Sequence, residues 1–547
     1  MVSHDASSVV ENEIILSAIR ATVDEMEFVI GRTAMSDGFR DKKDYFVGIF
    51  DIDGRMIHAL TSYSGAGMVN PVLRHFDVNE MKQGDIYFFN DPYASNGAVQ
   101  HLPDSVVVCP IFFEGQVLAL ATGFGHVADV GGSLMHNSGQ VQDVFDEGVG
   151  YPPIRVGQNY AFDDSFLRLI GRNSRHPDLI RGDLSALHAA CRLAEQRMVD
   201  LVGRYGYSVY RDMLQWAWSS TAQRARELIA QHIPDGEYRA SQNVHVGGHD
   251  CIVAVKLHKA DGRVTLDLTE SSDQVKGPWN YHSSLDGVRL LFALQLLVWD
   301  ASLLMNEGLL EVIDDAEFRE GSIVRPRFPA PLNRRSQVKS AVSNCLAKIM
   351  VEASGGAMTA PQPTYVVVSF FFNNGAEFSE TAGVGLGARP FADGPDVIYA
   401  PAQRNYPVEM VEAKYPLRVE KYGLRQDSGG SGEFRGGTGV VRRIRVLADA
   451  RVSPNMSNTS EPSEGVHGGG SGALGRVRVQ RLDGTWEEVD GTRSNVAVAS
   501  GEVVEILTPG GGGWGEPSRR QTQSINRDLA KGVISEAYAR DHYSGAK

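Results

Sequence analysis

The apolar positions near the start of the chain repeat with the period of a helix. Between residues 11 and 35 they recur mostly three or four positions apart, which predicts an amphipathic helix. The segments that follow are strand-like and contain two predicted hairpins. The first hairpin turns at residues 53–54, and the second joins strands at 106–113 and 116–123.

Helical patterns dominate the middle of the chain. Residues 163–233 predict three or more helices, with breaks near His176-Pro177 and Tyr205-Gly206, because proline and glycine interrupt helices. Further helices are expected at residues 284–306, 337–353 and 519–543. Strands and glycine-rich loops fill most of the rest, so we expect an α+β fold with β-rich N- and C-terminal parts around a helical middle. The expected parts are residues 1–160, 161–360 and 361–547.

Composition narrows the class of protein. The 547 residues exceed the roughly 250–300 at which a single core stops growing. The 53 basic and 67 acidic residues give a net charge of −14, which argues against general binding to nucleic acid or to an anionic membrane. No apolar run is long enough for a membrane span, and the first residues lack the features of a secretory leader. The four cysteines form no CxxC pair, so we expect reduced thiols and a cytoplasmic location.

Two His-x-x-Asp pairs stand at the two ends of the second predicted hairpin. They are His101 with Asp104 and His126 with Asp129. Antiparallel pairing of the hairpin strands would bring these ends together. Two imidazoles and two carboxylates favour a divalent transition metal such as Zn, Mn or Fe over Ca or Mg. A single His-x-x-Asp pair is more often a surface hydrogen bond or a turn, and that alternative stays open for each pair.

Two more carboxylates and an arginine pair are weaker candidates. Asp91 and Glu147 lie close enough in sequence to act as catalytic carboxylates at the same site, although caps and turns also use such residues. Arg334-Arg335 could bind a carboxylate or a phosphate, or could simply begin a solvated helix.

Glycine is unusually frequent, with 59 residues. The segment 429–439 is dense in glycine, but the chain contains no GxxxxGK[ST] loop for a nucleotide phosphate. A GxGxxG pattern at 470–475 precedes a strand-like segment instead of a helix, which argues against dinucleotide binding. We therefore favour a structural role for these glycines over anion binding.

Nine segments in order along the chain resemble the hydantoinase B/oxoprolinase family. This family includes N-methylhydantoinase B-type subunits, the C-terminal part of 5-oxoprolinase and alpha-type subunits of acetone carboxylase. The segments are GRTAMS (31–36), DYFVGIFDIDG (44–54), GDIYFFNDPY (84–93), HLPD (101–104), GHVADVGG (125–132), EGVGYPP (147–153), EAKYPLRV (412–419), LRQDSGGSGEFRGGTG (424–439) and TPGGGGWG (508–515).

The resemblance implies a hydantoinase B-like fold and a division of labour. A separate hydantoinase A-like subunit would bind ATP and phosphorylate a small-molecule substrate, and this chain would complete the opening of a cyclic amide in a hetero-oligomer. The resemblance also implies a metal on His101, Asp104 and His126, with Asp129 as the fourth ligand. A subunit of an ATP-dependent ketone carboxylase is one alternative, and a non-catalytic scaffold for the ATP-using subunit is another.

Two segments depart from the pattern of the family. They are residues 60–68, where relatives commonly carry a histidine, and residues 133–137, where relatives are rich in proline and glycine. Both could line the substrate pocket, so the substrate could differ from hydantoin or oxoproline. The same departures give some weight to the scaffold alternative.

Overall fold

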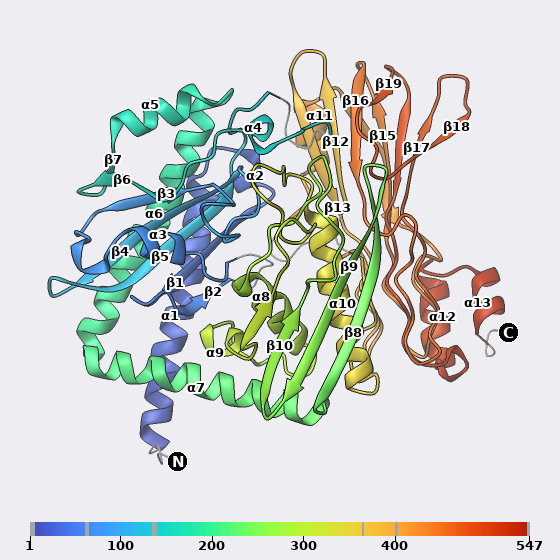
Figure 1. The fold of residues 1–547 in the computed structure, drawn as a ribbon. Coiled ribbons are helices and arrows are strands. Elements are labelled where there is room, and N and C mark those ends of the chain that lie inside the picture. The colour runs from blue at the N-terminus through green and yellow to red at the C-terminus, as the bar shows by residue number, and fades with distance from the viewer. Residues whose placement is uncertain (1–5, 61–64, 134–138, 364–365, 400–402, 544–547) are drawn as a thin grey trace.

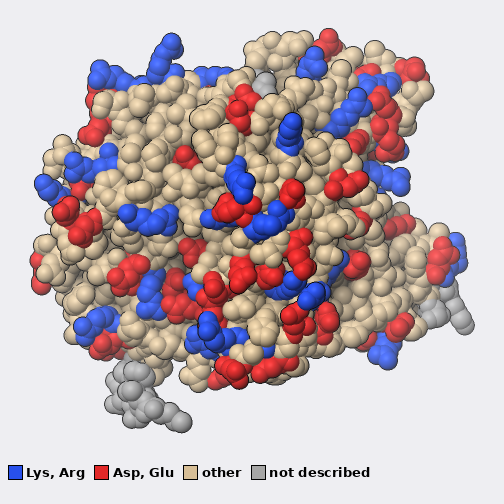
Figure 2. Space-filling view, in the orientation of Figure 1, with Lys and Arg blue, Asp and Glu red and all other residues tan. Residues whose placement is uncertain are grey.

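The computed structural model describes residues 6–60, 65–133, 139–363, 366–399 and 403–543. Figure 1 shows an N-terminal sheet backed by helices, a middle part around helix α10, and a C-terminal part of long strands. Among the described residues, no helix has the length and the hydrophobicity that a bilayer crossing requires. On the face in Figure 2, acidic and basic side chains are interspersed.

The N-terminal sheet has seven antiparallel strands in the order β2-β1-β5-β4-β3-β6-β7. The strands are β1 (Tyr45–Phe50), β2 (Met56–Ala59), β3 (Ile86–Phe89), β4 (Asp104–Phe113), β5 (Gln116–His126), β6 (Ile154–Gln158) and β7 (Ala161–Phe162). Successive side chains of a strand point to opposite faces. Accordingly, Phe46 and Phe50 of β1 join one hydrophobic cluster, whereas Val47 and Ile49 join another. Both faces of this sheet are therefore buried.

Helices cover one face of the N-terminal sheet. They are α1 (Ala6–Thr33), α5 (Asp164–Arg172), α6 (Pro177–Tyr205) and α7 (Tyr207–His232). The predicted helix breaks are confirmed, because α6 begins at Pro177 and Gly206 separates α6 from α7 with a φ of 88°. Since α6 packs on the N-terminal sheet, a continuous core extends across residue 160, and the division into three parts stays a prediction.

The other face of the sheet meets the middle part of the chain in a second cluster. This part has a four-stranded sheet of β8 (Gly236–Val246), β9 (His249–Ala260), β10 (Arg263–Asp267) and β11 (Asp315–Glu317), with helices α8 (Leu285–Leu296), α9 (Glu307–Leu310) and α10 (Ser336–Ala353). Helix α10 matches the predicted helix at 337–353 closely. Helix α8 is shorter than the predicted 284–306, because the chain turns after Leu297.

The C-terminal part contains two sheets around a third cluster. One has β12 (Val366–Phe372), β13 (Glu377–Ala382), β16 (Ala450–Asn455) and β19 (Val496–Val498); the other has β14 (Leu417–Leu424), β15 (Val440–Val446), β17 (Arg476–Gln480), β18 (Trp486–Val489) and β20 (Val503–Leu507).

The prediction of one helix at 519–543 is wrong. Gly532 adopts a φ of 66° and Ser535 caps a new helix, so α12 (Thr522–Ala530) and α13 (Glu536–His542) are separate. The shorter helices are α2 (Asp37–Arg40), α3 (Asn70–His75), α4 (Val144–Glu147) and α11 (Val408–Lys414).

The glycine-rich segments of the C-terminal part lie against one another and bond through their backbones. Gly430 N donates to Gly511 O at 2.9 Å, and Gly511 N donates to Gly437 O at 3.1 Å. A Cβ on Gly511 would overlap the carbonyl oxygen of Leu386. Glycine is needed here because the backbones approach closely, which agrees with the predicted structural role.

Candidate functional site

The second hairpin brings its two ends together, as predicted. Strand β4 begins at Asp104 and pairs with β5, which ends at His126, and these two residues lie directly opposite each other. A turn before β4, in which Asp104 N donates to His101 O at 3.0 Å, places the His101 side chain on the same side. The register of the hairpin therefore assembles the group His101–Asp104–His126.

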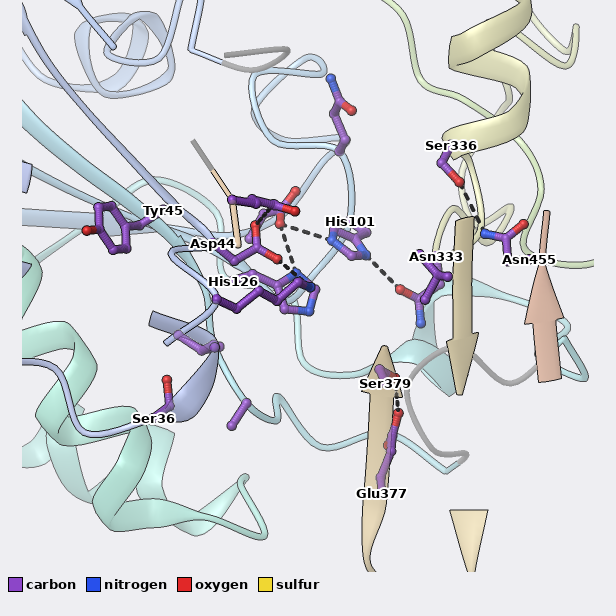
Figure 3. Close-up of a pocket in the computed structure, with 18 of the residues that line it drawn as sticks. Ser36, Asp44, Tyr45, His101, His126, Asn333, Ser336, Glu377, Ser379 and Asn455 are labelled. Atoms are coloured by element: carbon purple, nitrogen blue, oxygen red, sulfur yellow. Dashed lines mark hydrogen bonds and ion pairs between the residues drawn. The ribbon is translucent and has the colours of Figure 1, made fainter. Parts of the chain in front are cut away.

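The side chains of this group converge on one carboxylate oxygen. His101 Nε2 lies 3.0 Å from Asp104 Oδ1, and His126 Nδ1 lies 3.3 Å from the same atom (Figure 3). Each residue offers one ligand atom such that all three atoms lie within 4.8 Å of one another. His101 and Asp104 are each only 4% exposed, whereas the side chain of His126 is 22% exposed.

Burial and neighbouring charges fix the protonation states of His101 and Asp104. Burial, together with Arg335, lowers the pKa of His101 to about 4, so its imidazole is neutral at pH 7. Burial alone would raise the pKa of Asp104, but His101, His126 and Arg335 hold it well below its usual range. A neutral imidazole and an ionised carboxylate are the forms that bind metals.

The donor atoms of the group fit a divalent metal. A neutral His101 whose Nδ1 donates to Asn333 Oδ1 at 2.7 Å presents the lone pair of Nε2 to the Asp104 carboxylate. In that tautomer Nε2 and Oδ1 can both donate an electron pair to one cation. Their separation of 3.0 Å is close to the roughly 3.3 Å expected for two ligands about 2.0–2.1 Å from a tetrahedral ion.

Asp129, the fourth predicted ligand, lies outside this group. Its carboxylate is 2.7 Å from Arg175 Nη1 and also accepts bonds from the backbone of Arg175 and from Ser174 Oγ. The side chain lines the same cavity as the group, but its contacts are directed to the loop before α6.

The two carboxylates predicted to be catalytic have backbone partners. Asp91 Oδ1 accepts from Tyr93 N at 2.8 Å and from Ala94 N, so it caps a turn. Glu147 is 3% exposed, and its Oε1 accepts from Leu332 N and Asn333 N, both at 2.7 Å. Burial raises the pKa of Glu147 to about 8. Glu147 therefore supports the backbone that carries Asn333, and a catalytic role for either carboxylate stays a prediction.

The arginine pair does not begin a solvated helix. Arg334 is fully buried, and its guanidinium donates to Thr492 O at 3.2 Å, to Ser494 Oγ at 2.8 Å and to Pro454 O in the C-terminal part. Arg335 Nη2 lies 3.4 Å from Asp104 Oδ2. One arginine thus connects two parts of the chain, and the other reaches the candidate site.

A cavity of about 480 Å³ opens beside the group. Its walls come from the N-terminal sheet, from α10 and from the β12–β13 hairpin, so the site lies where three parts of the chain meet (Figures 1 and 3). Burial raises the pKa of Glu377 on β13 to about 8, and burial with Arg335 nearby lowers the pKa of Lys339 on α10 to about 7. Parts of both segments that depart from the family pattern, residues 61–64 and 134–137, lie outside the described residues.

Sequence analysis missed Asn333, Lys339 and Glu377. Each of them lines the cavity from an element far along the chain from the His101–Asp104–His126 group. The only sequence signal nearby is the Arg334-Arg335 pair, which adjoins Asn333.

Comparison with known proteins gives a consistent family match. The family model described as hydantoinase B/oxoprolinase matches residues 8–517. The caprolactamase subunit beta of Pseudomonas jessenii is 25% identical over 562 residues, which cover 97% of this chain and 94% of the relative.

Two solved structures share the fold. The crystal structure of the ATP-dependent caprolactamase from Pseudomonas jessenii matches with a TM-score of 0.83 and 22% identity, covering 98% of this chain and 96% of that chain. The nucleotide-free structure of acetone carboxylase matches with a TM-score of 0.79 and 17% identity, covering 98% and 79%. These matches, with the observed mixture of helices and sheets, confirm the predicted α+β class.

Proposed function

The chain belongs to the hydantoinase B/oxoprolinase family, and from this premise we propose that it is the B-type subunit of an ATP-dependent hydrolase that opens cyclic amides. The observation that carries the proposal is the His101–Asp104–His126 group on the wall of a cavity of about 480 Å³. A cavity of that size is within the range that encloses small molecules. A similar protein is named as an ATP-dependent caprolactamase, which acts on a cyclic amide.

ATP binding is assigned to a hydantoinase A-like partner subunit. This chain has no GxxxxGK[ST] loop, and its caprolactamase relative is named as one subunit of an enzyme. The partner would phosphorylate the amide oxygen of the substrate. This chain would then complete the ring opening inside a hetero-oligomer.

His101, Asp104 and His126 are the proposed ligands of a divalent transition metal, Zn, Mn or Fe. When bound, such an ion supplies Lewis-acid polarisation and lowers the pKa of water. In the tautomer that carries its proton on Nδ1, His101 donates to Asn333 Oδ1 at 2.7 Å, and the lone pair of its Nε2 would be a metal ligand. The proposed set leaves out Asp129, because its carboxylate would first have to release Arg175.

Glu377 is suited to donate the proton that the leaving nitrogen needs. Its carboxyl lines the cavity, and with a pKa of about 8 it is protonated at pH 7. Ser379 Oγ donates to Glu377 Oε1 at 3.3 Å, which orients the carboxyl (Figure 3). Asp91 and Glu147 lie outside the described cavity wall and are less well placed for this role.

The proposal is tested by co-expression of this chain with an ATP-binding A-type subunit. The pair should open at least one ring in a panel of lactams and hydantoins, and should form ADP in proportion to the opened ring. Each subunit alone should be inactive. Incorporation of labelled bicarbonate into a ketone, without ring opening, would instead identify a carboxylase subunit.

Asn333→Ala should weaken metal binding about 10- to 100-fold, because the partner that orients His101 is removed. The affinity is measured by competition against a chromophoric chelator. Asn333→Asp keeps an acceptor oxygen at the same reach and should bind metal at least as tightly as the wild type. Equal affinity of Asn333→Ala and the wild type would contradict the assigned orienting role.

A further inference from the structure

One face of helix α10 is polar although the helix is enclosed by protein. Val338, Val342 and Cys345 on its other side belong to the hydrophobic core. The polar face lines the cavity, and it begins at the end of the helix that lies next to His101 (Figure 3). Its members are Arg335, Ser336, Lys339, Ser340, Ser343 and Asn344. A polar face of this kind on an enclosed helix costs free energy unless its groups are hydrogen-bonded, by the protein, by water or by a ligand.

Two basic side chains on this face, Arg335 and Lys339, have the same carboxylate, Asp104, as their acidic neighbour. Arg335 Nη2 is 3.4 Å from Asp104 Oδ2, and Lys339, one turn later, lies 3.0 Å from the neutral amide oxygen of Gln100. Asp104 acts on both side chains, and since burial and Arg335 lower the pKa of Lys339 to about 7, a bound anion would stabilise the charged form of this lysine. Once Asp104 also serves as a metal ligand, the positive charge is less compensated, which favours an anion at this place.

Of the other carboxylates on the described cavity wall, Glu377 is protonated at pH 7 and Asp37 lies 2.7 Å from Lys414. Asp44 lies 3.0 Å from Lys42, and Asp129 lies 2.7 Å from Arg175. These pairs come from the N-terminal part and from the loop before α6. The basic groups nearest to Asp104 are Arg335 and Lys339, at the start of α10.

Hydroxyl groups beside the two cations are arranged as donors. Ser340 is 4% exposed and lines the cavity, and within the described part of the chain its Oγ has no hydrogen-bond partner. Ser336 Oγ accepts from Asn455 Nδ2 at 3.1 Å, so its own proton can be donated to a ligand. Helix α10 has 18 residues and no side-chain cap at its start, which adds the positive end of its dipole.

We propose that the first two turns of α10 bind the phosphoryl group of the activated substrate, with Arg335, Lys339, Ser336 and Ser340 as its donors. The group would lie beside the His101–Asp104–His126 site, because Arg335 contacts Asp104 directly. This inference rests on the proposed function, in which the partner subunit delivers a phosphorylated amide. A phosphate monoester and inorganic phosphate share the required chemistry, and the test separates them.

The test measures binding of ethyl phosphate and of inorganic phosphate to the full chain by calorimetry, with and without added divalent metal. The wild type should bind ethyl phosphate at one site. Lys339→Met should weaken this binding about 10- to 100-fold and Ser340→Ala about tenfold, as expected for lost hydrogen bonds to a charged group. Metal content should stay unchanged in both variants.

Lys348→Met is the matched control, because Lys348 is on the same helix but pairs with Glu464 away from the cavity. This variant should bind ethyl phosphate like the wild type. Unchanged affinity of both Lys339→Met and Ser340→Ala, or binding of inorganic phosphate alone, would overturn the inference. The titration needs no ATP, no partner subunit and no lactam. Its result is therefore independent of whether this chain and its partner subunit open a cyclic amide.

Discussion

His101→Ala should leave the purified chain without its metal and should lower turnover with the partner subunit by about 1000-fold or more. The ligand atom Nε2 of His101 lies 3.0 Å from Asp104 Oδ1 in a group of only three candidate ligands. Without it, one carboxylate and one imidazole remain, too few for a tight transition-metal site in a protein. Metal content is measured by elemental analysis, and turnover by the ring-opening assay.

The control for this change is His249→Ala. His249 is exposed on β9 and lies outside the cavity wall, so this variant should keep both the metal and the turnover. Circular dichroism of both variants separates loss of the site from loss of the fold. If His101→Ala kept full turnover in the assembled complex, the chain would be a scaffold and not the subunit that completes the reaction.

The convergence of Asp104 and His126 could be predicted from the sequence because it depends on local pairing. A two-residue turn at Glu114-Gly115 sets the antiparallel partners beside it, and the strand ends must then meet to within a residue. A register shift between Ile111 and Phe112, which the sequence did not predict, brings Asp104 opposite His126 and not opposite Gly125. The breaks at Pro177 and Gly206 were predictable for the same reason, since they act on the backbone where they occur.

The second His-x-x-Asp pair shows the limit of such reasoning. The two pairs look alike in sequence, but Asp104 begins a strand whereas Asp129 follows the end of one. Beyond His126 the chain leaves the sheet, and Asp129 bonds to Arg175, 46 residues later. Asp129 stays outside the His101–Asp104–His126 group because its carboxylate pairs with Arg175. The spacing of the His-x-x-Asp motif could not reveal this distant partner.

The residues that support the group come from still farther along the chain. Asn333 lies 232 residues after His101, and Glu147 meets Leu332 across 185 residues. Hydrophobic periodicity reports which face of an element is buried, but not which distant loop it meets. The polar face of α10 was missed because its meaning depends on the cavity that three parts of the chain enclose together.

Gly511→Val should remove the ordered packing of the glycine-rich segments and destabilise the C-terminal part by about 3–5 kcal/mol. A Cβ at this position would overlap the carbonyl oxygen of Leu386, and the obstacle is backbone that belongs to another packed segment. Gly511 also bonds to Gly430 and Gly437 through its backbone, so any shift breaks those two contacts. The overlap cannot be relieved by rotating a side chain, because the atom that the new Cβ meets belongs to the backbone.

Hydrogen exchange followed by mass spectrometry localises this effect. In Gly511→Val, peptides covering residues 429–439 should lose protection, whereas peptides of α6 should exchange as in the wild type. Gly423→Ala is the matched control, because a Cβ at Gly423 on β14 meets no atom within 4 Å. Unchanged protection in Gly511→Val would mean that these segments tolerate side chains, and the high glycine content would then need a reason other than close backbone packing. Strands β12 and β13 belong to the same C-terminal part and form one wall of the cavity. If the disorder caused by Gly511→Val reaches these two strands, the variant should also bind ethyl phosphate more weakly.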